Sequence, residues 1–349
     1  MNKIQFYSLI FIFSLLVFSC QKDRDIIPQT ENTATPSQTE YTGVFILNEG
    51  NFGWGNGSIT SYNPLTNESF YSVYQSANTL PLGDVVQSMS IAGDTGYIVV
   101  NNSQKIEIVS LSNFKQLGTI TGLTSPRYFL KVGNKGYVSD LYANAISIIN
   151  LQNNTISGTI PITSWTEQLL LAGTDIFVVN TGRRHVIVID SQTDQITDNI
   201  VVTLFPNSIV KDKNENIWAL CSGGEKKEVA ALYCIESASK KIIKTLLFPT
   251  LDNNPGNLSI NGERSILYYL DKNVYSLAVT DSTLPKNALI NANQELFYGL
   301  AIEPITNEIY VSDAIDYVQA GTVYRYSKDG NLIHQFKAGV IPGNFVFNN

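Results

Sequence analysis

The chain of 349 residues is 44% hydrophobic and only 15% charged, so it is long and apolar enough to bury a large core. Gly, Asn, Ser, Thr and Tyr are abundant, a balance that favours strands and turns over helices rich in Ala, Glu and Lys. The formal net charge of −7 provides no basic surface for a phosphate backbone and excludes nucleic acid as a partner.

Residues 1–19 have the pattern of a secretory signal. Lys3 is the positive n-region, and residues 4–18 are an apolar h-region that is too short to span a membrane comfortably. The run 16–20, LVFSC, resembles the lipobox of bacterial lipoproteins, in which the cysteine becomes the lipidated first residue. The resemblance implies lipidation at Cys20 and a membrane anchor made of acyl chains. An ordinary signal peptide with an incidental cysteine is the alternative.

Residues 20–42 are polar, contain two prolines and lack an apolar period, so they are expected to form a flexible tether after the lipidated cysteine. The stretch 21–25, QKDRD, resembles the charged export tag that places some lipoproteins on the outer face of the outer membrane. It implies a protein that faces the cell exterior. A solvated linker without an address is the alternative.

From Val44 onward, short apolar runs recur in units of roughly 40 to 50 residues, the period of propeller blades. Each unit divides into four strands, and the last strand is the most polar, as suits an outer edge. The second strand is the clearest, and its seven copies lie at residues 44–48, 96–101, 136–140, 175–180, 216–220, 265–269 and 308–313. The sequence therefore predicts an all-β fold, a seven-bladed β-propeller of four-stranded blades over residues 43–349.

The first strand of a unit is found only six times ahead of a second strand, at residues 87–91, 126–130, 167–171, 206–210, 255–260 and 298–302. The missing copy is the C-terminal run 342–347, PGNFVF. We expect it to pair beside residues 44–48 and to close the ring, which removes the exposed sheet ends of an open array. Phrases such as IYVSD at 309–313 and FVVN at 177–180 resemble the YVTN-type repeats of bacterial surface propellers.

The connections between second and third strands and between successive blades share one face of such a ring. They are long and aromatic, whereas the turns on the other face are short. Loops over a rigid scaffold are the usual place for binding groups. We therefore predict a ligand-binding face that includes Asn51, Trp54, Tyr142, Trp165, Arg183, Arg184, Phe297, Tyr298 and Tyr317. The alternatives are aromatic packing between blades and, for the two arginines, a solvated basic turn.

No metal signature and no catalytic constellation is present, so the sequence predicts no cofactor, no metal and no enzymatic activity. Asp140, Asp313 and Asp316 lie near second-strand ends, where strand-end capping is expected and a calcium ring is the alternative. Cys221 and Cys234 are expected on neighbouring strands as free buried thiols, although a bridge is permitted in the cell envelope.

The runs LNEGNFG at 47–53, GSI at 57–59, YNP at 62–64 and LGDVVQ at 82–87 resemble a family of bacterial surface-lipoprotein propellers, the DUF5074 family. Some members capture cobalamin and pass it to a TonB-dependent outer-membrane transporter. The resemblance implies a surface protein that collects a cobalamin-like ligand beside such a transporter. A protein–protein scaffold at the cell surface and a propeller lyase or lactonase are the alternative functions.

Overall fold

The structure is a computed structural model that describes residues 41, 43–224 and 227–348. The chain separates into two compact units, Met1–Thr35 and Pro36–Asn349. The proposed signal peptide, Cys20 and the tether up to residue 40 lie outside the described residues. All the described residues belong to the second unit, Pro36–Asn349.

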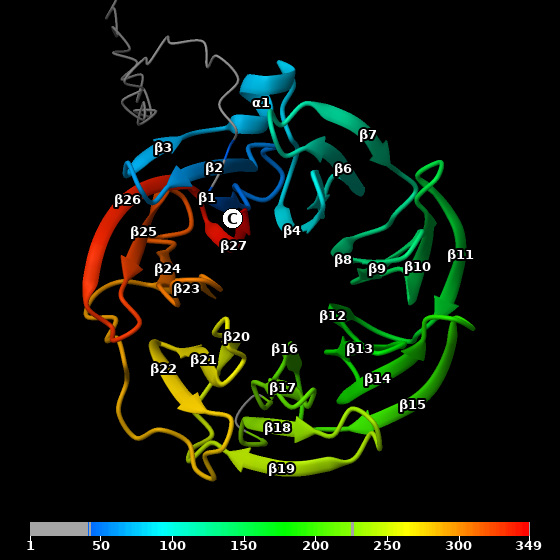
Figure 1. The fold of residues 1–349 in the computed structure, drawn as a ribbon, viewed down its shortest axis with the longest axis vertical. Coiled ribbons are helices and arrows are strands. Elements are labelled where there is room, and N and C mark those ends of the chain that lie inside the picture. Colours follow the sequence, from blue (N-terminus) through cyan, green and yellow to red (C-terminus); the bar gives the residue numbers. More distant parts are fainter. Residues whose placement is uncertain (1–40, 42, 225–226, 349) are drawn as a thin grey trace, which may run out of the picture. The chain divides into compact units, whose positions relative to one another are not determined.

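The described residues form seven antiparallel sheets that follow one another around a ring (Figure 1). In each sheet the strands are ordered from the inside of the ring outward. Blade 1 consists of β27 (Pro342–Asn348), β1 (Gly43–Asn48), β2 (Ser58–Asn63) and β3 (Glu68–Phe70). Blade 2 consists of β4 (Val86–Ala92), β5 (Thr95–Val100), β6 (Lys105–Ser110) and β7 (Gln116–Ile120). Blade 3 consists of β8 (Pro126–Val132), β9 (Lys135–Asp140), β10 (Ala145–Asn150) and β11 (Thr155–Pro161).

The remaining blades continue the same order. Blade 4 consists of β12 (Thr166–Ala172), β13 (Asp175–Asn180), β14 (His185–Asp190) and β15 (Gln195–Val201). Blade 5 consists of β16 (Pro206–Lys211), β17 (Ile217–Cys221), β18 (Ala231–Ile235) and β19 (Ile242–Leu247). Blade 6 consists of β20 (Gly256–Ile260), β21 (Ile266–Asp271) and β22 (Asn273–Ala278). Blade 7 consists of β23 (Phe297–Ile302), β24 (Ile309–Asp313), β25 (Ala320–Tyr326) and β26 (Leu332–Val340). The predicted seven-bladed propeller is confirmed.

The core lies between blades rather than at the centre of the ring. The second strands are buried on both faces, as β1, β17 and β24 show, whereas the outer strand β15 is mostly exposed. Each pair of neighbouring blades encloses one hydrophobic cluster among the described residues. Continuous apolar runs in the middle strands are therefore required by packing against a blade on either side.

Ring closure by the C-terminal strand is confirmed. β27 pairs antiparallel with β1, so that Ile46 lies opposite Phe345 and Val44 opposite Phe347. Blade 7 is also tied to blade 1 by side chains, since the Asn48 Oδ1 accepts the backbone N–H of Gly339 at 2.9 Å. Pairing of the two chain ends leaves no open blade in the ring.

Blade 6 differs from the expected pattern because it has three strands instead of four. The chain after β22 reaches the vacant outer position only at one bridge, where the Val274 N–H donates to the Ile290 carbonyl at 3.0 Å. Pro285 lies in this connection, and a proline cannot donate to a strand ladder.

The two described cysteines are free and buried, as expected. Cys221 in β17 pairs with Ala231, and Cys234 in β18 pairs with Trp218. Cys221 packs in the cluster between blades 4 and 5, and Cys234 in the cluster between blades 5 and 6. Because the side chains point to opposite faces of one sheet, they cannot form a bridge.

The described residues include one short α-helix, α1 (Val73–Asn78), in the connection between blades 1 and 2. Over that part of the chain, no helix is long and apolar enough to cross a membrane.

Candidate functional site

A register shift recurs in the innermost strand of all seven blades, close to the end where the long loops lie. Such a bulge leaves its extra residue outside the ladder and turns that side chain away from the pairing direction. The first unpaired residue of each blade forms a set that we call the collar: Gln87, Arg127, Glu167, Asn207, Asn257, Tyr298 and Gly343.

One arc of the collar is a charged pair shared by blades 3 and 4. The Arg127 Nε donates to Glu167 Oε2 at 2.9 Å, and the Arg127 Nη1 donates to Gln87 Oε1 of blade 2. The side chains of Arg127 and Glu167 are only 20% and 14% exposed. Burial raises the pKa of Glu167, although the charge of Arg127 opposes that shift. Burial alone would lower the pKa of Arg127, but the Glu167 carboxylate raises it.

Tyr128 follows Arg127 in the same bulge and adds a neutral phenol to this arc. Its hydroxyl forms hydrogen bonds with Gln168 and Gln87, and burial raises the pKa of Tyr128 to about 12. The phenol therefore keeps its proton at neutral pH.

The next arc consists of amides and hydroxyls from blades 5 and 6. The Asn207 Nδ2 donates to the Pro255 carbonyl at 2.9 Å, and the Ser208 hydroxyl donates to the Asn207 Oδ1 at 2.7 Å. The Asn257 Nδ2 donates to the Tyr298 carbonyl at 2.6 Å. The two bonds donated by the asparagines run between neighbouring blades, and the Ser208 bond lies within β16; together they fix the amide orientations.

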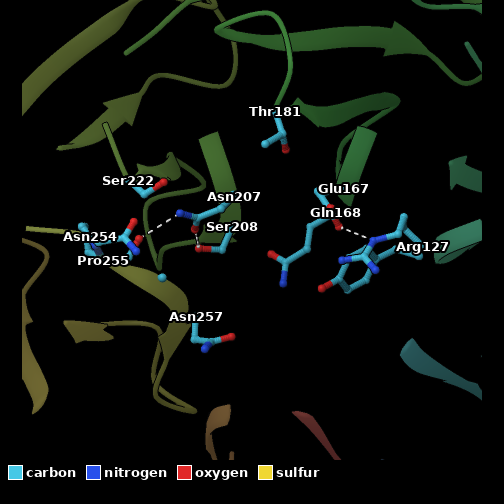
Figure 2. A pocket seen from close by; sticks show the side chains of 12 residues that line it. Arg127, Glu167, Gln168, Thr181, Asn207, Ser208, Ser222, Asn254, Pro255 and Asn257 are labelled. Carbon is cyan, nitrogen blue, oxygen red and sulfur yellow. Dashed lines mark hydrogen bonds and ion pairs between the residues drawn. The ribbon is translucent and has the colours of Figure 1, made fainter. Parts of the chain in front are cut away.

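The two arcs enclose a cavity of about 320 Å³, which we call the mouth pocket. Figure 2 shows the side chains of Arg127, Glu167, Asn207 and Asn257 around it. Other walls come from the long connections: Thr181 from the loop after β13, Ser222 from the loop after β17, and Asn254 from the connection before β20. The mouth pocket therefore lies on the face that carries the long loops, and its lining is polar.

A second polar cluster lies where blade 7 meets blade 1. The Tyr298 hydroxyl donates to Glu49 Oε1 at 2.9 Å, and the Tyr298 ring meets Tyr317 edge-on with centroids 5.5 Å apart. The Asn51 Nδ2 donates to the Tyr317 carbonyl at 2.9 Å. Burial raises the pKa of Glu49, and Arg127 and Glu167 also act on it electrostatically. The two clusters thus share one electrostatic environment.

The predicted site residues divide into two sectors. Tyr317 contacts both Asn51 and Tyr298 where blade 7 meets blade 1, and Trp54 follows Asn51 on its loop, 69% exposed. Tyr142 and Trp165 are 63% and 45% exposed on adjacent connections of blades 3 and 4. The Asn144 Oδ1 joins these connections by accepting the Ser164 N–H, at 3.1 Å.

The remaining predicted residues have different surroundings. Arg184 donates to Glu228 at 2.8 Å and holds a positive φ of 62°, so it is part of a fixed turn. Arg183 is exposed beside it. Phe297 packs into the hydrophobic cluster between blades 6 and 7, so the alternative of packing between blades describes this residue.

The residues that line the mouth pocket were not among those predicted from the sequence. Most of them lie on innermost strands, whereas the predicted residues were chosen from the loops. A signal was present, because a polar residue directly follows the first residue of an innermost strand in six of the seven blades. The bulge that exposes that residue leaves no trace in an alternating pattern.

The aspartates at second-strand ends act as caps. Asp140 accepts backbone N–H groups from Ser125 at 2.7 Å and Tyr142 at 2.8 Å, and Asp313 accepts from Leu296 at 3.0 Å. Asp316 accepts from two backbone groups of its own loop. Across the described ranges, no cluster of three or more His, Cys, Asp or Glu side chains is placed to hold a metal ion.

Fold and site together define a seven-bladed β-propeller with a polar pocket at the loop-side end of its innermost strands. Residues 42–348 match the family described as Domain of unknown function (DUF5074), and the chain belongs to that family. No curated protein matches the sequence.

Solved propellers resemble the chain in fold. A quinonprotein alcohol dehydrogenase-like protein from Bacteroides thetaiotaomicron is 14% identical with a TM-score of 0.67, over 89% of this chain and 79% of that one. A putative 6-phosphogluconolactonase from Bacteroides fragilis is 13% identical with a TM-score of 0.66, and the match covers 90% of this chain and 100% of that one. At these identities the similarity shows the fold alone.

Proposed function

We propose that this protein is a surface lipoprotein that captures a small ligand at the loop-side mouth of its propeller and does not catalyse a reaction on it. The observation that carries the proposal is the mouth pocket, whose walls present oriented amides, hydroxyls and one ion pair. Convergent polar groups in a concave site fix the orientation of a bound small molecule and give specificity.

A cobalamin-like corrinoid is the first ligand to test. It is a broad apolar ring edged with amides and carries one phosphodiester. The mouth pocket offers amide partners, while Trp54, Tyr142 and Trp165 offer exposed aromatic surface on the same face. Arg183 is available for a phosphate. The likeness of residues 47–53 and 82–87 to cobalamin-capturing lipoproteins supports this choice.

We also propose that the protein is located at the outer membrane and has a transporter as its partner. Lipidation at Cys20 would anchor the chain to the outer membrane, with the tether holding the propeller on the exterior side. A TonB-dependent transporter in the same membrane would receive the ligand. Metabolic labelling with a palmitate analogue tests the anchor, since Cys20→Ser should abolish the label.

Titration with cyanocobalamin tests the ligand. Wild-type protein should bind, and Asn207→Ala with Asn257→Ala should weaken binding by about tenfold or more, because two oriented amides are lost. The matched control is Asn134→Ala, an exposed asparagine in the short turn between β8 and β9 on the opposite face. Absence of binding by the wild type at high micromolar concentration would remove this ligand.

A protein–protein scaffold is the second candidate, and one observation favours it. Phe52, Trp54 and Val318 are 76%, 69% and 62% exposed on loops that the Asn51 to Tyr317 bond holds together. Exposed apolar groups on ordered loops are typical of docking surfaces. Capture of a transporter from envelope extracts without any small ligand, lost in Phe52→Ser with Trp54→Ser, would support this role.

A further inference from the structure

We infer that Glu167 determines the charge selectivity of the mouth pocket: by pairing with Arg127, it excludes anions and restricts the pocket to neutral groups that carry a hydrogen-bond donor beside an acceptor. The inference deepens the proposed function, because it requires that the pocket receives the ligand. It assigns a specificity role to one carboxylate.

The pocket would be an anion site if Glu167 were absent. A guanidinium in a polar pocket is a strong partner for carboxylate and phosphate. Among the residues that line the mouth pocket, only Arg127 and Glu167 carry a charge. Their 2.9 Å contact makes the lining neutral overall, and it uses the Nε edge of the guanidinium. The Nη1 is occupied as well, by the Gln87 amide oxygen.

An anion that approached Arg127 would meet two carboxylates. Glu167 is in direct contact with the guanidinium, and Glu49 acts on Arg127 from the cluster at blades 7 and 1. A like charge this close to the guanidinium repels an incoming anion, and the partly buried setting weakens the screening of that repulsion by water. Much of the attraction by Arg127 is thereby cancelled.

A neutral ligand meets the opposite situation. Adjacent Arg and Glu side chains present donors beside an acceptor, and each asparagine of the lining does the same with its Nδ2 and Oδ1. A primary carboxamide or a pair of neighbouring hydroxyls has the complementary pattern. Asn207, Asn254 and Asn257 repeat that pattern around the remaining wall, and no hydrocarbon side chain other than Pro255 belongs to the lining.

The substitution that tests the inference is Glu167→Gln. Glutamine preserves the size of the side chain and one oxygen that can accept from the Arg127 Nε, so the geometry is retained while the negative charge is lost. Circular dichroism and a thermal melt confirm folding. Binding of inorganic phosphate is then measured by isothermal titration at pH 8 and low ionic strength.

We expect phosphate to bind E167Q at least about tenfold more tightly than wild type. The double variant with Arg127→Gln should lose that gain. The matched control is Glu215→Gln, which releases Lys211 and Arg264 on the other face of the ring and should add no binding at the pocket. Equal phosphate affinity in wild type and E167Q, or a gain in E167Q that Arg127→Gln leaves unchanged, would overturn the inference.

Two neutral probes separate the possible sources of the ligand. Cyanocobalamin supplies carboxamides, and methyl α-glucoside supplies neighbouring hydroxyls. Binding of either one to wild type, weakened in E167Q, supports the inference and identifies the source. If neither binds while E167Q gains phosphate, the corrinoid proposal fails but charge selection stands. If cyanocobalamin binds and phosphate binds wild type equally well, the proposed function stands and the charge selection is wrong.

Discussion

Substitution of Phe345 by alanine should destabilise the propeller strongly, although the residue lies only four positions before Asn349. Phe345 is only 6% exposed and belongs to the cluster between blades 7 and 1. Its backbone pairs with Ile46, and its ring centroid lies 6.1 Å from that of Tyr310. The side chain therefore contributes to the joint that closes the ring.

The expected loss is about 3–5 kcal/mol, the usual cost of truncating a buried phenylalanine. For a domain of about 300 residues, an unfolding entropy of roughly 0.6 kcal/mol/K converts this into a fall in Tm of roughly 5–8 °C. A thermal melt followed by circular dichroism measures that fall, and urea unfolding gives the free energy independently.

The matched control is Phe52→Ala, which truncates a phenylalanine that is 76% exposed and should change stability by less than about 0.5 kcal/mol. Deletion of residues 342–349 should have a far larger effect and abolish a single cooperative transition, because blade 1 loses its innermost strand and β1 keeps only its pairing with β2. If the Phe345 variant melts together with the Phe52 variant, the C-terminal strand does not close the ring, and the account of the fold is wrong.

Three further predictions concern other parts of the propeller. Asp140→Ala should cost about 3 kcal/mol in urea unfolding, since several backbone N–H groups lose a buried acceptor, whereas Asp316→Ala on an exposed loop should cost much less. Burial raises the pKa of Glu49 above its ordinary value, so ionisation of this carboxyl opposes folding. The stability of Glu49→Gln relative to wild type should therefore improve as the pH rises from about 4 to 7, and a flat difference would contradict the assignment. Cys221 and Cys234 should react with a maleimide only in denaturant, and a mass loss of two hydrogens before treatment would show a bridge instead.

The architecture could be predicted because it depends on patterns that repeat. The middle strands must be apolar on both faces, and that requirement appears seven times along the chain. Closure followed from counting, since the only unmatched first strand was the run that forms β27. The missing fourth strand of blade 6 could not be predicted. It depends on the path of the connection after β22, and strand propensity does not determine that path.

The site could be predicted only in part. Loop residues such as Trp54 and Tyr142 are exposed, as an aromatic loop face requires. The pairing of Arg127 with Glu167 could not be predicted, because the two residues are 40 positions apart and meet only when neighbouring blades are placed side by side. Phe297 was predicted as a loop aromatic, but it is the first residue of β23 and packs, partly buried, against the cluster between blades 6 and 7.

The central claim is that the loop-side mouth of the propeller is where a ligand binds. The most direct test is a structure of the protein determined with cyanocobalamin at saturating concentration. The account predicts a corrinoid with amides within hydrogen-bond distance of Asn207 and Asn257 and with its ring beneath the long loops. A corrinoid on the short-turn face or on the outer strands would contradict it, whereas a protein that stays empty at high micromolar concentration would exclude cyanocobalamin as the ligand.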